Sequence, residues 1–242
     1  MKISAVSYLN TKPFIYGLEQ LPEGTIELSL DIPSECSRKL LSGEVEIGLV
    51  PVAVLKQMPE HHIISDFCIG AVGKVDSVKL YSQVPLNEIT EVVLDYHSKT
   101  SVALVKILAN ELWKICPIWT AAEQGFETEI EGTKAAVIIG DRTFGLTNKY
   151  AFEYDLSEAW KELTGLPFVF AVWASRKKLD SAFELKFSNA LHIGIESAKT
   201  VSEINQPHYP EIDVFRYLTK SISYHLDHEK RKAIELFLEK LE

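Results

Sequence analysis

The segment with the clearest chemical potential runs from an apolar stretch of strand length, Val92–Leu94, through a polar turn into a helical repeat. Ser98, Thr100 and Ser101 stand where that helix would begin, and short hydroxyl side chains there pair with free backbone N–H groups. A strand, a hydroxyl-rich turn and a helix in this order place amide donors and the positive end of a helix dipole at one sheet edge. The pattern predicts an anion-binding turn, although an ordinary helix cap has the same residues.

A second unit of this kind lies near the N-terminus. Residues 3–8 predict a strand, and Asn10 and Thr11 follow it as a polar turn. Pro13 suits the first turn of a helix that ends near Glu19. Since this turn also offers amide donors at a sheet edge, Asn10 could either cap the helix or bind a ligand.

A third polar turn follows a buried strand. Residues 135–140 are a continuous apolar run, typical of a parallel strand buried on both faces. The next residue, Asp141, could act as a general base, orient one, or cap the following helix. Arg142 could clamp a carboxylate. His97, beside Ser98, is the one histidine expected near a ligand.

The composition is that of an ordinary globular protein, with 242 residues of which 46% are apolar and 24% charged. The formal net charge of −9 argues against nucleic acid or an anionic membrane as the main partner. No apolar run reaches membrane-spanning length, and the first apolar stretch is too short for a signal peptide. We therefore expect a cytoplasmic protein, either a monomer or a homodimer, with a small molecule as its partner.

Cysteine usage and motif content bound the chemistry further. Cys36, Cys68 and Cys116 are widely spaced, with no Cys-x-x-Cys pair, and predict buried thiols in a reducing compartment. The sequence has no metal-ligand spacing, no glycine-rich phosphate loop and no dinucleotide fingerprint. We expect neither a metal nor a cofactor.

Strands and helices alternate along the chain, which predicts an α/β fold with parallel or mixed sheets. Two crossings would divide it into lobe 1, residues 1–88 and 168–242, and lobe 2, residues 89–167. The chain is helical in character after residue 179, with one helix over about 180–199 and two more to the end. A ligand cleft between the lobes would be lined by the turns at Asn10, Pro51, Ser77, Ser98 and Asp141.

Several segments along the chain carry a combined signal: residues 6–13 (VSYLNTKP), 49–52 (LVPV), 73–82 (GKVDSVKLYS), 98–104 (SKTSVAL), 139–141 (IGD), 154–156 (YDL) and 160–171 (WKELTGLPFVFA). Taken together and in this order, these segments resemble the chorismate dehydratases of the futalosine route to menaquinone. The resemblance covers residue 3 to about 176. It implies the two-lobed fold of type II periplasmic solute-binding proteins, used for catalysis in the cytoplasm.

The resemblance also implies a reaction. Chorismate would lose a hydroxyl and a proton from adjacent ring carbons, giving 3-[(1-carboxyvinyl)oxy]benzoate and water. Because the ring becomes aromatic, the protein mainly has to hold a dianion, orient it and stabilise charge. One helix terminus contributes only about 0.3–1 kcal/mol when exposed, so several termini and hydroxyl groups must act together.

The resemblance implies a separate binding role for each turn. Ser98, Thr100 and Ser101, with their backbone amides, would bind one carboxylate. Ser77 and the turn at Asn10 and Thr11 would bind the second carboxylate or the leaving hydroxyl. Other residues expected around the substrate are Tyr8, Leu9, Pro51 and Gly140.

Asn10 is the residue that we expect to act in catalysis, since its amide can donate to a departing oxygen without any pKa tuning. Asp141 is the second catalytic candidate, unless a substrate carboxylate takes the proton itself. The family tends towards small or apolar residues after Gly-Asp, so Arg142 departs from its pattern.

Two other functions compete with this one. The fold's commonest use is the capture of small anions, so a non-catalytic intracellular binding or sensing module is one alternative. The other is the sister enzyme that makes 1,4-dihydroxy-6-naphthoate, whose N-terminal turn is of a Ser-Pro-Cys-Pro-Asn-Asp-Thr type. The turn Tyr8-Leu9-Asn10 favours the dehydratase.

Overall fold

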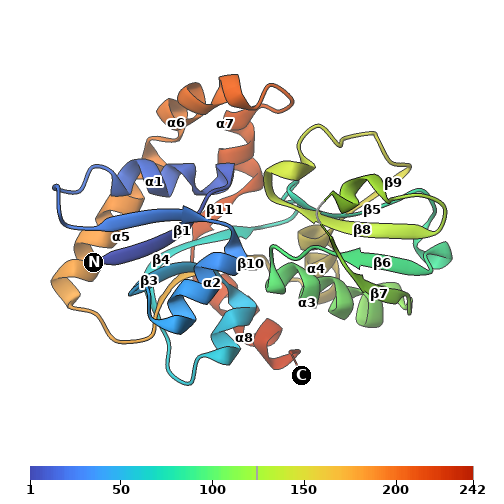
Figure 1. The fold of residues 1–242 in the computed structure, drawn as a ribbon, viewed down its shortest axis with the longest axis horizontal. Coiled ribbons are helices and arrows are strands. Elements are labelled where there is room, and N and C mark those ends of the chain that lie inside the picture. Colours follow the sequence, from blue (N-terminus) through green and yellow to red (C-terminus); the bar gives the residue numbers. More distant parts are fainter. Residues whose placement is uncertain (124, 242) are drawn as a thin grey trace.

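The computed structural model describes residues 1–123 and 125–241 and contains two β-sheets that lie side by side, each with its own helices (Figure 1). The first sheet has the strand order β11-β4-β10-β3-β1-β2. Its strands are β1 (Lys2–Val6), β2 (Glu27–Asp31), β3 (Ile47–Pro51), β4 (His62–Ala71), β10 (Phe168–Ser175) and β11 (Ser223–His225).

The second sheet is built from the middle of the chain, with the order β7-β6-β8-β5-β9. Its strands are β5 (Val78–Ser82), β6 (Glu91–Leu94), β7 (Ile118–Ala121), β8 (Lys134–Ile139) and β9 (Phe152–Asp155). Helices α3 (Lys99–Leu108) and α4 (Leu156–Thr164) accompany this sheet (Figure 1). The other helices are α1 (Lys12–Leu18), α2 (Pro33–Ser42), α5 (Ser181–Glu196), α6 (Ala198–Asn205), α7 (Val214–Arg216) and α8 (His228–Glu239).

Both sheets are mixed, and the expected α/β class is confirmed. Strand β1 is parallel to β2 and β3, whereas β10 is antiparallel to β3 and β4. In the second sheet β6 is parallel to β7 and β8, and β5 is antiparallel to β8 and β9. Every residue of β3 and β10 is buried, which is why these strands are continuous apolar runs in the sequence.

Helix α1 is fixed in place because α5 packs directly against its backbone. A Cβ atom on Gly17 would lie 1.8 Å from the Ala190 carbonyl oxygen, and one on Gly194 would lie 1.8 Å from the Pro13 carbonyl oxygen. Glycine at both positions therefore lets the two helices touch, where a larger residue would separate them. This contact holds the single turn η1 (Leu9–Thr11), which directly precedes α1.

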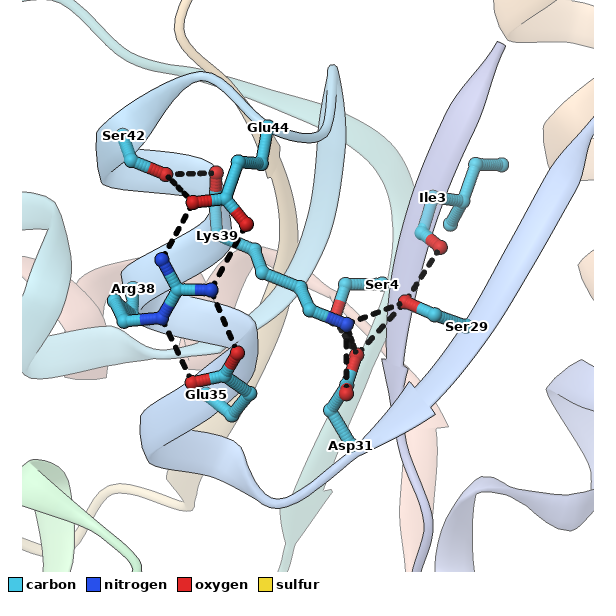
Figure 2. A network of polar contacts seen from close by, with 9 residues as sticks. All are labelled: Ile3, Ser4, Ser29, Asp31, Glu35, Arg38, Lys39, Ser42 and Glu44. Carbon is cyan, nitrogen blue, oxygen red and sulfur yellow. Dashed lines mark hydrogen bonds and ion pairs between the residues drawn. The ribbon is translucent and has the colours of Figure 1, made fainter.

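Helix α2 is tied to the edge of the first sheet by a polar network (Figure 2). Lys39 Nζ lies 2.8 and 2.7 Å from the two carboxylate oxygens of Asp31, at the end of β2. The hydroxyl groups of Ser4 and Ser29 each donate to Asp31 Oδ2 at 2.7 Å. Burial would raise the pKa of Asp31, but the bonds from Lys39, Ser29 and Ser4 hold that pKa below its ordinary value.

Sheet membership differs from the expected division at one strand. Strand β5 pairs with β8 and β9, so residues 78–82 lie with the second sheet and not in the lobe predicted to extend to residue 88. The sequence pattern identified the strand correctly, but its pairing partners follow it by more than fifty residues. The change of sheet falls between Ala71 and Val78.

Three further expectations are corrected. The region after residue 179 also contains β11, which pairs with β4. The helix expected over 180–199 is interrupted at Ser197, between α5 and α6. Cys36 and Cys68 are buried as expected, but Cys116 is exposed.

Candidate active site

A pocket with about 500 Å³ of space free of protein atoms lies between the two sheets, at the turns that follow their strands. Eight of the residues that the sequence predicted for the site line this pocket. Four come from the side of the first sheet: Tyr8, Asn10, Thr11 and Pro51. Four come from the side of the second sheet: Ser77, Ser98, Ser101 and Gly140. The remaining wall is apolar: Val6, Pro33, Ile69, Val75, Val78, Ile139, Phe170 and Ala171. Leu9, Thr100 and Asp141 do not line the pocket.

The start of α3 forms one wall. Ser98 is the N-cap, and its Oγ accepts hydrogen bonds from the backbone N–H and the hydroxyl of Ser101, both at 3.3 Å. Because this oxygen already accepts twice, the Ser98 hydroxyl hydrogen is left for donation. With the positive end of the α3 dipole behind it, this wall favours a negatively charged group.

Thr100, two residues after Ser98, connects the two halves of the protein through a hydrogen bond. Its Oγ1 accepts from the backbone N–H of Ala53 at 3.0 Å, and both groups are buried. Ala53 belongs to the short helix η2 (Val52–Gln57), which follows β3. Thr100 therefore holds the start of α3 against the first sheet and does not line the pocket.

Asn10 is almost fully buried, with 9% of its surface exposed. Its Oδ1 accepts from the Thr11 hydroxyl at 3.2 Å, and its backbone carbonyl accepts from the Tyr224 hydroxyl at 2.8 Å. Since the carbonyl oxygen of the side chain is already used, the NH₂ group is what Asn10 presents to its surroundings.

Asp141 holds the turn that carries Asn10. Its two carboxylate oxygens lie 3.0 and 3.1 Å from the backbone N–H of Leu9, and Oδ2 also accepts from the Tyr209 hydroxyl at 2.8 Å. Burial raises the pKa of Asp141, and the bonds from Leu9 and Tyr209 oppose that rise. These contacts fit a positioning role better than that of a base facing the pocket.

Ser77 and Gly140 meet where the start of β5 lies beside the end of β8. The Gly140 N–H donates to the Ser77 carbonyl at 2.8 Å, and the Ser77 Oγ accepts from the Tyr217 hydroxyl at 2.8 Å. Gly140 has φ +67°, and a Cβ there would lie 2.6 Å from Tyr8 Cε2. Only glycine combines this backbone conformation with so close an approach of the tyrosine ring.

The Tyr8 hydroxyl is hydrogen-bonded to His97 Nδ1, which connects the first sheet with the turn before α3. Burial, reinforced by the nearby positive charge of Arg142, lowers the pKa of His97. Burial also raises the pKa of Tyr8. Near neutral pH the pair therefore consists of a neutral imidazole and a neutral phenol.

Arg142 does not point into the pocket as a carboxylate clamp. Its guanidinium is paired with Asp95, and its Nη1 also donates to Glu127 at 2.8 Å. Asp95 is fully buried and accepts in addition from the backbone N–H groups of His97 at 2.9 Å and Ile139 at 3.1 Å. Arg142 thus neutralises a buried carboxylate that fixes the turn after β6 to the end of β8.

Four residues that position the site were missed by sequence reasoning: Asp95, Tyr209, Tyr217 and Tyr224. Asp95 had a local signal, since a polar residue directly follows the apolar strand Val92–Leu94. The three tyrosines had no local signal, because each contacts a residue that lies far away in the sequence.

The described residues contain no group of three or more His, Cys, Asp or Glu that could hold a metal ion. Within the same part of the chain, no helix has both the length and the apolar character needed to cross a membrane. Trp160, which precedes the return to the first sheet, is fully buried, and its Nε1 donates to the Pro167 carbonyl at 3.1 Å. It is a core residue.

Comparison with solved structures shows the fold. A protein from Archaeoglobus fulgidus has a TM-score of 0.77 at 13% identity, covering 99% of this chain and 95% of its own. The alkanesulfonate-binding protein SsuA from Xanthomonas axonopodis pv. citri, bound to MOPS, has a TM-score of 0.65 at 13% identity and coverage of 99% and 92%. A Candida albicans protein described as having the generic periplasmic-binding-protein fold has a TM-score of 0.59 at 14% identity and coverage of 98% and 89%. The expected periplasmic-binding-protein-like fold is confirmed.

Comparison of sequences shows the family. The chorismate dehydratase of Thermus thermophilus is 30% identical over an alignment of 233 positions, and the match covers 87% of this chain and 84% of that protein. A family model described as menaquinone biosynthesis matches residues 1–242. The chain belongs to this menaquinone biosynthesis family.

Proposed function

We propose that this protein is a chorismate dehydratase, a hydro-lyase that removes water from chorismate to give 3-[(1-carboxyvinyl)oxy]benzoate. The observation that carries the proposal is the relation to the Thermus thermophilus chorismate dehydratase along most of both chains. The chemistry of the pocket supports it in three steps.

The first step is the direction of the hydrogen bonds. Ser98 Oγ and Ser77 Oγ each accept from a protein donor, and Asn10 uses its side-chain oxygen to accept from Thr11. The groups left to a ligand at three points of the wall are therefore donors. A molecule with acceptors at both ends, such as a dicarboxylate, matches that arrangement.

The second step is the apolar wall between these donors. Ile69, Val75, Ile139 and Phe170 enclose the space in which a six-membered ring would lie. Water excluded from such a site cannot screen the contacts of the carboxylates with hydroxyl and amide donors, so these contacts act at low dielectric.

The third step concerns the group that accepts the proton from the ring of the substrate. Tyr8 is the only titratable side chain among the described residues that line the pocket, and burial raises its pKa, which makes it a poor base. We infer that a carboxylate of the substrate accepts the ring proton, while the Asn10 amide donates to the departing hydroxyl. The C–H electron pair becomes part of the aromatic ring as the C–O bond breaks, and the departing hydroxyl takes the abstracted proton from the substrate's carboxylic acid and leaves as water.

The test is turnover of chorismate by the purified protein without added metal, followed by ultraviolet absorbance and product mass. The wild type should give a product lighter by one water. Asn10→Ala should lower kcat by about 10²–10³-fold, the range for loss of one oxyanion-type donor, while chorismate still raises the melting temperature. Asn189→Ala, on the exposed face of α5, is the matched control and should leave kcat unchanged.

Other results identify the competing functions. Binding of chorismate without turnover would favour a binding or sensing module. Absence of both binding and turnover would contradict the dehydratase and leave the sister naphthoate-forming activity to be assayed with its own substrate.

A further inference from the structure

The last third of the chain brings three tyrosine hydroxyls to the back of the pocket. Tyr209 donates to Asp141, Tyr217 to Ser77, and Tyr224 to the backbone carbonyl of Asn10, each at 2.8 Å. The acceptors of these bonds belong to residues that bind the substrate or position the site in the proposed function. Among the three, only Tyr217 binds the side chain of a residue that lines the pocket.

Tyr217 is held so that its hydroxyl can have few orientations. The residue is buried with 4% exposure at the junction of α7 and the following π-helical turn, Tyr217–Ser221. The ring of Phe144, from the second sheet's side, packs edge-on against it with centroids 5.1 Å apart. Burial raises the pKa of Tyr217, so the phenol keeps its hydrogen and can donate it to Ser77.

The direction of the Tyr217–Ser77 bond decides what Ser77 can do. A serine hydroxyl has one hydrogen to donate, and with Tyr217 as donor that hydrogen must point elsewhere. No hydrogen bond among the described residues uses the Ser77 hydroxyl as donor, and Ser77 lines the pocket. The remaining direction is the pocket itself.

We propose that Tyr217 is a positioning residue that turns Ser77 into an obligate donor to the substrate and holds it in register with Asn10. The inference rests on the proposed function and deepens it. Without Tyr217, the Ser77 hydroxyl could rotate and accept from water or from Asn10, and the pocket would lose a preorganised donor. Preorganisation of donors accounts for a large part of electrostatic catalysis.

The experiment is a double-mutant cycle of Tyr217→Phe and Ser77→Ala, with kcat, KM, chorismate binding and melting temperature measured for each protein. Tyr217→Phe should lower kcat/KM by about tenfold, and Ser77→Ala by about 10–100-fold. The double variant should be no worse than Ser77→Ala by more than about threefold, because the tyrosine acts only through the serine. Tyr81→Phe is the matched control, since Tyr81 is also buried but its hydroxyl has no hydrogen-bond partner among the described residues.

Each result has a defined meaning. Kinetics of Tyr217→Phe equal to those of Tyr81→Phe, or losses that multiply in the double variant, would overturn the positioning role. A lowered melting temperature with kinetics unchanged at a permissive temperature would reduce Tyr217 to a structural residue and also overturn it. A wild type that binds chorismate without turnover would refute the proposed reaction, but would keep the positioning role if Tyr217→Phe weakens binding only when Ser77 is present. A wild type that neither binds nor converts chorismate would refute both.

Discussion

At the scale of single residues, the site works by fixing the direction of neutral groups. Ser98 and Ser77 are forced to donate because other protein groups already occupy their oxygens. Asn10 is constrained in the same way by Thr11. The proposed dianionic substrate can bind to a chain whose net charge is −9 because these short-range donors outweigh a screened global field.

Gly140 provides a prediction at this scale. Gly140→Ala should lower the free energy of unfolding by about 2–4 kcal/mol, since alanine must adopt the left-handed φ of +67° and its Cβ meets the Tyr8 ring at 2.6 Å. The displaced ring should also lower kcat/KM by breaking the contact with His97. Urea unfolding and chorismate kinetics measure the two effects.

A second glycine distinguishes the strain of the left-handed backbone from the steric clash with the Tyr8 ring. Gly24 has a similar φ of +79° but no atom within 4 Å of its Cβ position, and it is exposed. Gly24→Ala should therefore cost only about 1 kcal/mol and leave the kinetics unchanged. Equal effects of the two substitutions on stability and activity would show that the approach of Tyr8 to Gly140 does not matter.

At the scale of elements, the attachment of α2 to β2 should be visible in the pH dependence of stability. The pKa of Asp31 in the folded protein is below its ordinary value of 3.8, and that of Lys39 is above its ordinary value of 10.5. The stabilisation from Asp31 is present above pH 3.8 and is lost as the pH falls through the lowered pKa. The stabilisation from Lys39 is present below pH 10.5 and is lost as the pH rises through the raised pKa.

We therefore expect Asp31→Asn to lower the free energy of unfolding by about 1–2 kcal/mol at neutral pH and by much less below the lowered pKa of Asp31. Unfolding by urea at a series of pH values measures the difference. Arg38→Gln is the matched control on the same helix, because its ion pairs with Glu35 and Glu44 (Figure 2) are exposed and should contribute less to stability than the half-buried pair of Asp31 and Lys39. A difference between Asp31→Asn and wild type that is independent of pH would contradict the role of the charge.

Elements were predictable from the sequence where their residues carry a strong periodic pattern. The apolar runs of β3, β8 and β10 identify these strands because both faces are buried. β11 has only three residues and exists because β4 offers it an edge, which no local pattern can show. For the same reason β5 was identified as a strand but assigned to the wrong sheet.

The site was predictable to a similar extent. Turns at strand ends predicted Asn10, Ser77 and Ser98 as candidates: Asn10 and Ser98 follow a strand, whereas Ser77 directly precedes β5. Polar residues at strand ends converge in an α/β fold. The orientation of each side chain was not predictable, since it depends on partners far away in the sequence. Thr100 and Asp141 are examples: both belong to the correct turns, yet they point at the other lobe's backbone.

At the scale of the whole molecule, the pocket is closed by bonds between the two halves of the chain. Leu9 N–H donates to Asp141, Ala53 N–H donates to Thr100, and Tyr8 binds His97. Because both halves contribute to the wall, we expect that separation of the halves opens the pocket to a substrate. The measured affinity for the substrate then depends on the free-energy difference between the open and the closed form of the protein.

Thr100→Val should shift this equilibrium towards the open form. Valine has nearly the same shape as threonine but cannot accept from Ala53, and leaving that N–H buried and unpaired costs about 1–3 kcal/mol, which opening relieves. Small-angle scattering should give a larger radius of gyration for the ligand-free variant, with a return to the wild-type value at saturating chorismate. KM should rise by about tenfold while kcat changes little, because the saturated enzyme is closed in both proteins. Thr90→Val, which removes an exposed hydroxyl pair with Thr133 outside the pocket, should change none of these quantities. A radius and a KM equal to those of the wild type would mean that the bond from Ala53 does not hold the lobes together.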